Sequence, residues 1–133
     1  VEDKRFFFFF VGSKSVIEYY KKKLRIDLEI VEITKAHIVD GKLENGKLHL
    51  INIDTDIDKL EFGKHTELGG ALSIKYLDKA IELCHGKYVD GIVTCPISKD
   101  SINMAGFKYS GHTEYLAEKS KTEDFAMVLK GKN

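Results

Sequence analysis

The segment Phe6-Phe7-Phe8-Phe9-Phe10-Val11-Gly12-Ser13 decides the fold class. Its apolar run is continuous rather than alternating, which is typical of a strand buried on both faces of a sheet. Gly12-Ser13 marks a turn, and residues 14–24 follow as a predicted amphipathic helix. The apolar side of this helix consists of residues at spacings of three and four: Val16, Ile17, Tyr20 and Leu24. A buried strand that turns into such a helix indicates an α/β fold.

A hairpin is predicted after a second strand at Leu28–Ile33. Two extended segments, Ala36–Leu43 and Lys47–Asp54, are joined by Glu44-Asn45-Gly46. Asn-Gly between extended runs is a strong short-range hairpin signal. We therefore expect these two segments to pair with each other.

The second half of the chain is predicted to contain the longest helix, Glu67–His85. Its apolar stripe indicates a packing helix without a role in chemistry, and consists of Ile74, Leu77, Ile81 and Cys84. Gly91–Cys95 is mainly β-branched and stops at Pro96, so we expect a strand that ends in a defined loop. The remaining predicted elements are a helix at Ser98–Ala105, a helix that begins near Gly111 and a strand at Phe125–Leu129.

The composition narrows the class of partner. The 133 residues are 43% hydrophobic, which is the range of one ordinary globular domain. The 21 basic residues balance 21 acidic residues, so no overall charge favours nucleic acid or an anionic membrane. The longest apolar run, Phe6 to Val11, is far shorter than the roughly 20 residues that span a bilayer. We expect a soluble, cytoplasmic protein whose partner is a small molecule.

The two cysteines, Cys84 and Cys95, are each flanked by apolar residues. This setting is typical of buried, structural thiols in a reduced cytoplasmic protein. A disulfide between the two cysteines stays open as an alternative.

Most nucleotide and metal motifs are absent from the sequence. There is no GxGxxG fingerprint, Walker loop, CxxC or HExxH. No two histidines have the helical i, i+3 or i+4 spacing that would bring both rings to one metal. We therefore predict no metal site within the chain itself.

A candidate anion site lies around Gly111. In an open α/β sheet, ligands bind beyond the carboxyl ends of the strands, where we expect Pro96 to Lys99 and the helix start at Gly111 to lie. Gly111 allows close backbone approach, and the first N–H groups of the helix are free to bind an anion. His112 and Thr113 would add side-chain donors, which suits a substrate phosphate.

A purely structural interpretation of the same residues is also open. Ser110 or Thr113 would then cap a surface helix, and His112 would be an exposed loop residue. Lys99 is unfavourable at a helix start unless an anion or a carboxylate compensates its charge, and the neighbouring Asp100 offers one.

Three runs resemble the central signature of the 4-hydroxythreonine-4-phosphate dehydrogenases (PdxA family) of vitamin B6 synthesis. They are Val93-Thr94-Cys95-Pro96-Ile97-Ser98-Lys99, Ile102-Asn103-Met104-Ala105-Gly106 and Ser110-Gly111-His112-Thr113-Glu114-Tyr115-Leu116-Ala117-Glu118. The resemblance is densest from Gly91 to Glu118. It implies an α/β/α sandwich similar to isocitrate and isopropylmalate dehydrogenases, and a homodimer whose interdomain active site is completed by the partner subunit.

The resemblance also implies that residues 1–133 are a single α/β fragment from the N-terminal and central parts of a larger two-domain dehydrogenase. Family chains are more than twice as long and begin with a glycine- and proline-rich segment that has no counterpart before Val1. Their metal-binding histidines and most of their dinucleotide site would lie beyond Asn133. We therefore expect a chain truncated at both ends, prone to self-association or instability and without turnover on its own.

The implied reaction is the oxidation of 4-phosphohydroxy-L-threonine, followed by decarboxylation, in pyridoxal 5'-phosphate biosynthesis. The implied cofactors are NAD (or NADP) and a divalent metal ion such as zinc, magnesium or cobalt. The metal would bind the substrate hydroxyl and amino groups and favour the alkoxide that transfers hydride. Of the family's functional residues, only the substrate-binding pair carries over, onto His112 and Thr113, and no catalytic residue is assigned.

Three alternatives stay open. In the first alternative, the substrate of the intact enzyme is phosphorylated threonate or erythronate. In the second, the chain is a catalytically inactive remnant that still binds phosphate-bearing ligands. In the third, the chain is a structural α/β module that merely contains Gly-His-Thr-Glu.

Overall fold

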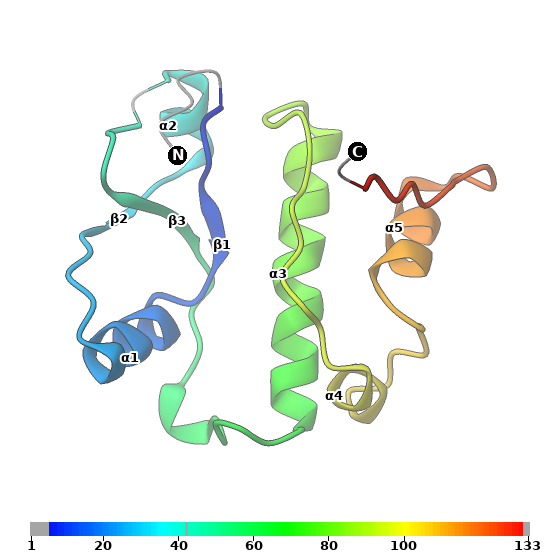
Figure 1. Cartoon of the computed structure of the whole chain (residues 1–133), viewed down its shortest axis with the longest axis horizontal. Coiled ribbons are helices and arrows are strands. Elements are labelled where there is room, and N and C mark those ends of the chain that lie inside the picture. Colours follow the sequence, from blue (N-terminus) through cyan, green and yellow to red (C-terminus); the bar gives the residue numbers. More distant parts are fainter. Residues whose placement is uncertain (1–5, 42, 132–133) are drawn as a thin grey trace.

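The computed structural model describes residues 6–41 and 43–131 and shows an α/β architecture, as predicted (Figure 1). Its elements are β1 (Phe10–Gly12), α1 (Lys14–Leu24), β2 (Ile30–Glu32), α2 (Lys35–Val39), β3 (Leu48–Asn52), the 3-10 turn η1 (Ile57–Lys59), α3 (Glu67–His85), α4 (Lys99–Met104) and α5 (His112–Ser120). The strands form one parallel sheet in the order β1-β3-β2. Helix α3 stands between this sheet and the pair α4 and α5 (Figure 1). None of the helices in the described part of the chain is long and apolar enough to cross a membrane.

Helix α1 has the predicted bounds because its start and end are both capped. Ser13 Oγ accepts a hydrogen bond from the Val16 N–H, and Arg25 adopts the left-handed conformation that ends the helix. The residues that anchor it differ from the prediction. Leu24 is exposed, whereas Tyr19 stacks on Phe62 with ring centroids 4.1 Å apart.

The prediction of a long strand over Phe6–Val11 buried on both faces is wrong. The strand begins only at Phe10, and Phe6, Phe7 and Phe8 are each more than 60% exposed. Phe9 and Val11 pack into the core, while Phe10 between them is 50% exposed. Only one face of β1 therefore contacts other described residues, so the run alternates in burial although its sequence does not.

The predicted hairpin is also wrong. Residues 35–39 of the predicted first arm form α2, and β3 in the predicted second arm pairs in parallel with β1 and β2 instead. Local capping favours the helix, since the Thr34 N–H donates to His37 Nδ1 at 3.1 Å. Gly46 does adopt the positive φ that Asn-Gly signals, at +81°, but its turn connects α2 to β3. Lys42, within the predicted first arm, lies outside the described residues.

The strands predicted at Gly91–Cys95 and Phe125–Leu129 are absent from the described structure. Val93 is 87% exposed and Leu129 is 89% exposed, and neither segment has a hydrogen-bonded neighbour among the described residues. A strand needs such a neighbour to satisfy its backbone. The prediction of a buried Cys95 fails for the same reason, because Cys95 is exposed, and both it and the half-buried Cys84 are free thiols.

Helix α3 has the predicted bounds and contributes to two hydrophobic clusters. Its residues Ile74, Leu77 and Ile81 pack with Ile102 of α4 and Tyr115 of α5. Leu83, which the predicted stripe omits, packs instead with Ile51 of β3 and with Ile33, the residue directly after β2. The loop, α4 and α5 that carry the candidate site are therefore held by α3 rather than by the sheet.

Candidate substrate-binding site

The start of α5 presents backbone donors that no side chain occupies. Gly111 is the N-cap residue, its backbone is extended, and no side chain accepts a hydrogen bond from the first turn. His112 and Thr113 are both half-buried. Among residues 6–41 and 43–131, neither of their backbone N–H groups has a hydrogen-bond acceptor. A Cβ added at Gly111 would meet no atom within 4 Å, so the space in front of this turn is open.

The structural alternative, in which Ser110 or Thr113 caps the helix, is not what the structure shows. Both donors of Ser110 go to the carboxylate of Glu114, the N–H to Oε2 at 2.9 Å and the hydroxyl to Oε1 at 2.5 Å. These two bonds, from the Ser110 hydroxyl first and its N–H second, lower the pKa of Glu114, and the charge of Lys99 lowers it further. Glu114 therefore stays ionised beside the open turn.

The loop before α4 is tied to the start of α3. Ser98 caps α4 by accepting from the Ser101 N–H, and its hydroxyl lies 2.8 Å from His65 Nδ1. The Thr66 N–H donates to Ser101 Oγ at 3.3 Å. The nearest carboxylate to His65 is Asp100, 3.9 Å from Nε2. Asp100 thus lies beside His65. The positive charge of Lys99 acts instead on Glu114 of α5, whose pKa it lowers.

Helix α5 is fixed on α3 by a buried phenol. Tyr115 is only 2% exposed, and its hydroxyl donates a hydrogen bond to the Asp78 carboxylate. Burial, then this bond, raises the pKa of Tyr115. The sequence analysis missed this pair, although Asp78 stands four residues after Ile74, at the edge of the apolar face of α3, where its carboxylate is partly exposed. A polar residue at the edge of such a face is a usable signal for a hydrogen bond to a side chain packed on that face.

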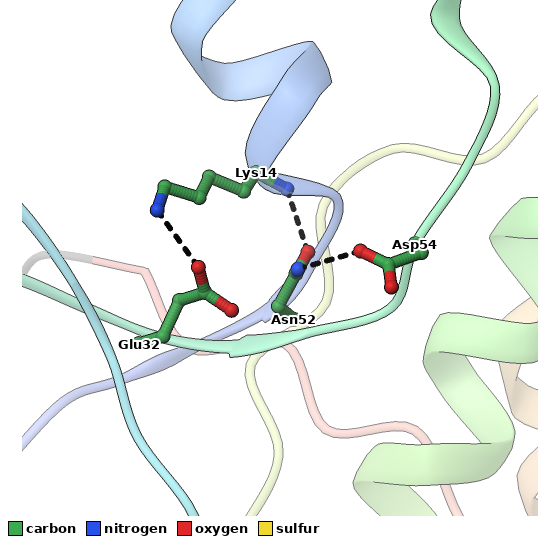
Figure 2. A network of polar contacts seen from close by, with 4 residues as sticks. All are labelled: Lys14, Glu32, Asn52 and Asp54. Carbon is green, nitrogen blue, oxygen red and sulfur yellow. Dashed lines mark hydrogen bonds and ion pairs between the residues drawn. The ribbon is translucent and has the colours of Figure 1, made fainter.

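A second polar network lies at the carboxyl ends of the three strands, and the sequence analysis missed it as well (Figure 2). The Lys14 backbone N–H donates to Asn52 Oδ1 at 2.9 Å, and Asn52 Nδ2 donates to Asp54 at 2.8 Å. The Lys14 ammonium bonds Glu32 at 2.8 Å, which lowers the pKa of Glu32 and raises that of Lys14. Side chains of the chain itself thus accept hydrogen bonds from the backbone N–H groups at the start of α1. A pyrophosphate would need those donors free.

A family model described as "Pyridoxal phosphate biosynthetic protein PdxA" matches residues 4–133 of this chain. The chain belongs to this family. A 4-hydroxythreonine-4-phosphate dehydrogenase from a Sulfurihydrogenibium species is 42% identical over 118 residues, covering 89% of this chain and 35% of that protein. A putative D-threonate 4-phosphate dehydrogenase from Fusobacterium nucleatum is 36% identical over 115 residues, covering 86% and 34%.

The fold matches a solved PdxA-type structure. The crystal structure of 4-hydroxythreonine-4-phosphate dehydrogenase from Klebsiella pneumoniae superposes with a TM-score of 0.82 at 27% identity, covering 91% of this chain and 37% of that one. This confirms the predicted family and the predicted dehydrogenase-like α/β fold. The chain spans about a third of the length of these relatives.

The described residues of this PdxA-family chain do not fit a divalent metal. Within ranges 6–41 and 43–131, no three His, Cys, Asp or Glu side chains come close enough together to hold one. Four of the five histidines lie on four different elements and His65 lies in the loop before α3, while His65 and His37 are each hydrogen-bonded to a neighbouring hydroxyl. No step of chemistry is therefore assigned to a metal held by these side chains.

Proposed function

We propose that this chain provides the phosphate-binding part of an NAD- and divalent-metal-dependent dehydrogenase. Its substrate would be 4-phosphohydroxy-L-threonine, oxidised and then decarboxylated in pyridoxal 5'-phosphate biosynthesis. The observation that carries this proposal is the family match over residues 4–133, which includes the uncapped helix start at Gly111, His112 and Thr113.

The local chemistry at the start of α5 supports a phosphate ligand. The backbone N–H groups of His112 and Thr113 have no acceptor in the described structure, and the helix dipole favours negative charge there. The His112 ring and the Thr113 hydroxyl supply further donors beside them. The open space at Gly111 allows the phosphate oxygens to approach the backbone.

The metal and the nicotinamide cofactor, NAD or NADP, would be held by other residues of the intact enzyme. The occupied start of α1 supports this division, because the Lys14 N–H already donates to Asn52 Oδ1. In the same proposal, residues 1–133 are one α/β part of a two-domain chain that works as a cytoplasmic homodimer. Exposed apolar side chains, Phe6 to Phe8 and Val128 to Leu129, support the presence of further protein that covers them.

The second candidate is a dehydrogenase for D-threonate 4-phosphate or phosphorylated erythronate. The 36% identity to the putative D-threonate 4-phosphate dehydrogenase favours it. Both substrates carry the phosphate for which the α5 start is suited, and they differ in the amino group of the threonine derivative. The contacts that recognise this amino group would then decide between them.

The test is NADH formation by the complete product of the gene, with either phosphorylated substrate and an added divalent metal. We expect turnover of 4-phosphohydroxy-L-threonine to exceed that of D-threonate 4-phosphate, and His112→Ala to raise KM strongly. Preference for the threonate would establish the second candidate. Phosphate binding without turnover of either compound would indicate an inactive remnant.

A further inference from the structure

Glu114 commits both of its carboxylate oxygens to one residue. Each oxygen accepts one donor of Ser110, the backbone N–H and the side-chain hydroxyl. The two bonds close a small ring of chain around Gly111, with His112 and Thr113 between the bonded residues. Charge-assisted hydrogen bonds of this kind are among the stronger ones in proteins and restrict the geometry of the turn that they close.

Three other helix starts, those of α1, α3 and α4, are capped in a different way. Ser13, Thr66 and Ser98 each accept a hydrogen bond from a backbone N–H in the first turn of the helix that follows. Such a cap fixes the turn but occupies one of the free donors. At α5 the fixing bonds run from Ser110, before the N-cap, to the third residue of the helix. In the described structure the turn is therefore held without occupying any of the first three N–H groups of α5, whereas the caps of α1, α3 and α4 each occupy the third.

We propose that Glu114 is a positioning residue of the phosphate site, which holds the Ser110-Gly111 turn so that the free N–H groups at the start of α5 face the ligand. This inference rests on the proposed function, in which a phosphate binds at His112 and Thr113. Glu114 does not contact the phosphate and acts only through the turn.

The sign of the effect distinguishes positioning from simple electrostatics. A carboxylate beside a bound phosphate repels it, so the loss of a merely adjacent negative charge should tighten phosphate binding. A positioning carboxylate has the opposite effect, because without it the turn samples conformations that do not present the donors together. The charge of Lys99, which lowers the pKa of Glu114, partly offsets this repulsion.

The experiment compares Glu114→Ala with Glu118→Ala in the complete gene product. Both changes remove one negative charge from α5, and Glu118 accepts its bond from the Tyr109 hydroxyl, away from the Gly111 turn. The measurement is the dissociation constant of inorganic phosphate by isothermal titration calorimetry, with the melting temperature as a check on folding. We expect Glu114→Ala to weaken binding by ~10-fold, the loss of a charge-assisted bond pair, and Glu118→Ala to change it little.

Partial variants sharpen the test. Glu114→Gln keeps one acceptor oxygen and should recover part of the affinity. Ser110→Ala removes the hydroxyl but keeps the N–H bond, so it should weaken phosphate binding less than Glu114→Ala does. Should Glu114→Ala fail to fold, Ser110→Ala carries the test, and unchanged phosphate affinity in that variant would overturn the inference.

Two further results separate the inference from the proposed function. Equal or tighter phosphate binding by a folded Glu114→Ala protein, with binding still dependent on His112, overturns the positioning role alone. Wild-type binding that is absent, or unaffected by His112→Ala, overturns the proposed phosphate site and the positioning role together.

Discussion

Gly70 of α3 lies against the backbone carbonyl of Ser101 in α4. A Cβ at Gly70 would stand only 1.9 Å from the Ser101 oxygen, so the two helices approach as closely as they do because residue 70 has no side chain. The contact holds the loop before α4 in place, together with the Thr66 N–H bond to the Ser101 hydroxyl. The candidate site is thus attached to the longest helix at its first turns.

The substitution Gly70→Ala should therefore destabilise the protein. The added methyl group must push α3 and α4 apart, and overpacking of this kind costs about 1–3 kcal/mol of unfolding free energy. Urea denaturation of the complete gene product measures the loss. Gly91→Ala is the matched control, because a Cβ at Gly91 meets no atom within 4 Å and should leave the midpoint nearly unchanged.

Loss of the Tyr115 hydroxyl should also destabilise the protein. Tyr115→Phe leaves the ring in place in the core but removes the donor to Asp78, whose other described partner is Lys119 at 3.6 Å. Removing a hydrogen bond to a charged group lowers the free energy of unfolding by about 1.5–3 kcal/mol. The loss is smaller where solvent reaches the acceptor, as it reaches the Asp78 carboxylate. A melting temperature equal to that of the wild type would show that the bond contributes nothing to holding α5.

The substitution Gly111→Ala should separate folding from binding. The φ of Gly111 is 167°, which any residue adopts, and the added methyl group meets no described atom, so the melting temperature should stay unchanged. Phosphate affinity should nevertheless fall, because the methyl group enters the space through which the ligand approaches the backbone. Calorimetric titration with inorganic phosphate decides this, and undiminished affinity would exclude close approach at Gly111.

Acid should weaken the link between α2 and α3. Bonds from Lys35 and then Lys79 lower the pKa of Glu82 from 4.5 to about 2. A depressed carboxylate pKa stabilises the fold above pH 4.5, and this contribution disappears as the pH falls through about 2. Melting temperatures between these pH values should therefore fall more for the wild type than for Glu82→Gln. High salt should reduce the difference, since these side chains are exposed.

Helices α1, α3, α4 and α5 could be predicted because their signals are local, whereas α2 lies where an extended segment was predicted. The spacing of Ile74, Leu77 and Ile81 gave α3, and Ser98 marked the start of α4. The strands could not be placed in the same way, because a strand needs a neighbour that may lie far along the chain. Apolar, β-branched residues at 91–95 therefore predicted a strand where the described structure has none.

The same difference between local and long-range signals applies to the candidate site. Its residues Gly111, His112 and Thr113 were found from a short motif at a helix start. The contacts that hold the site join residues distant in sequence, such as His65 with Ser98 and Asp78 with Tyr115, which are 33 and 37 positions apart. No pattern within a single helix specifies such pairs, so the sequence indicated the candidate residues at the start of α5 but not the contacts that hold this helix in place.

The most direct test of the phosphate site is the ratio of kcat/KM for 4-phosphohydroxy-L-threonine to kcat/KM for unphosphorylated 4-hydroxy-L-threonine. It is measured by NADH formation with the complete gene product and compared with the ratio for a His112→Ala, Thr113→Ala double variant. We expect a large preference for the phosphorylated compound in the wild type and its near loss in the variant, with the unphosphorylated compound turned over equally by both. A variant that keeps the wild-type ratio would contradict phosphate binding at His112 and Thr113 and place the phosphate elsewhere.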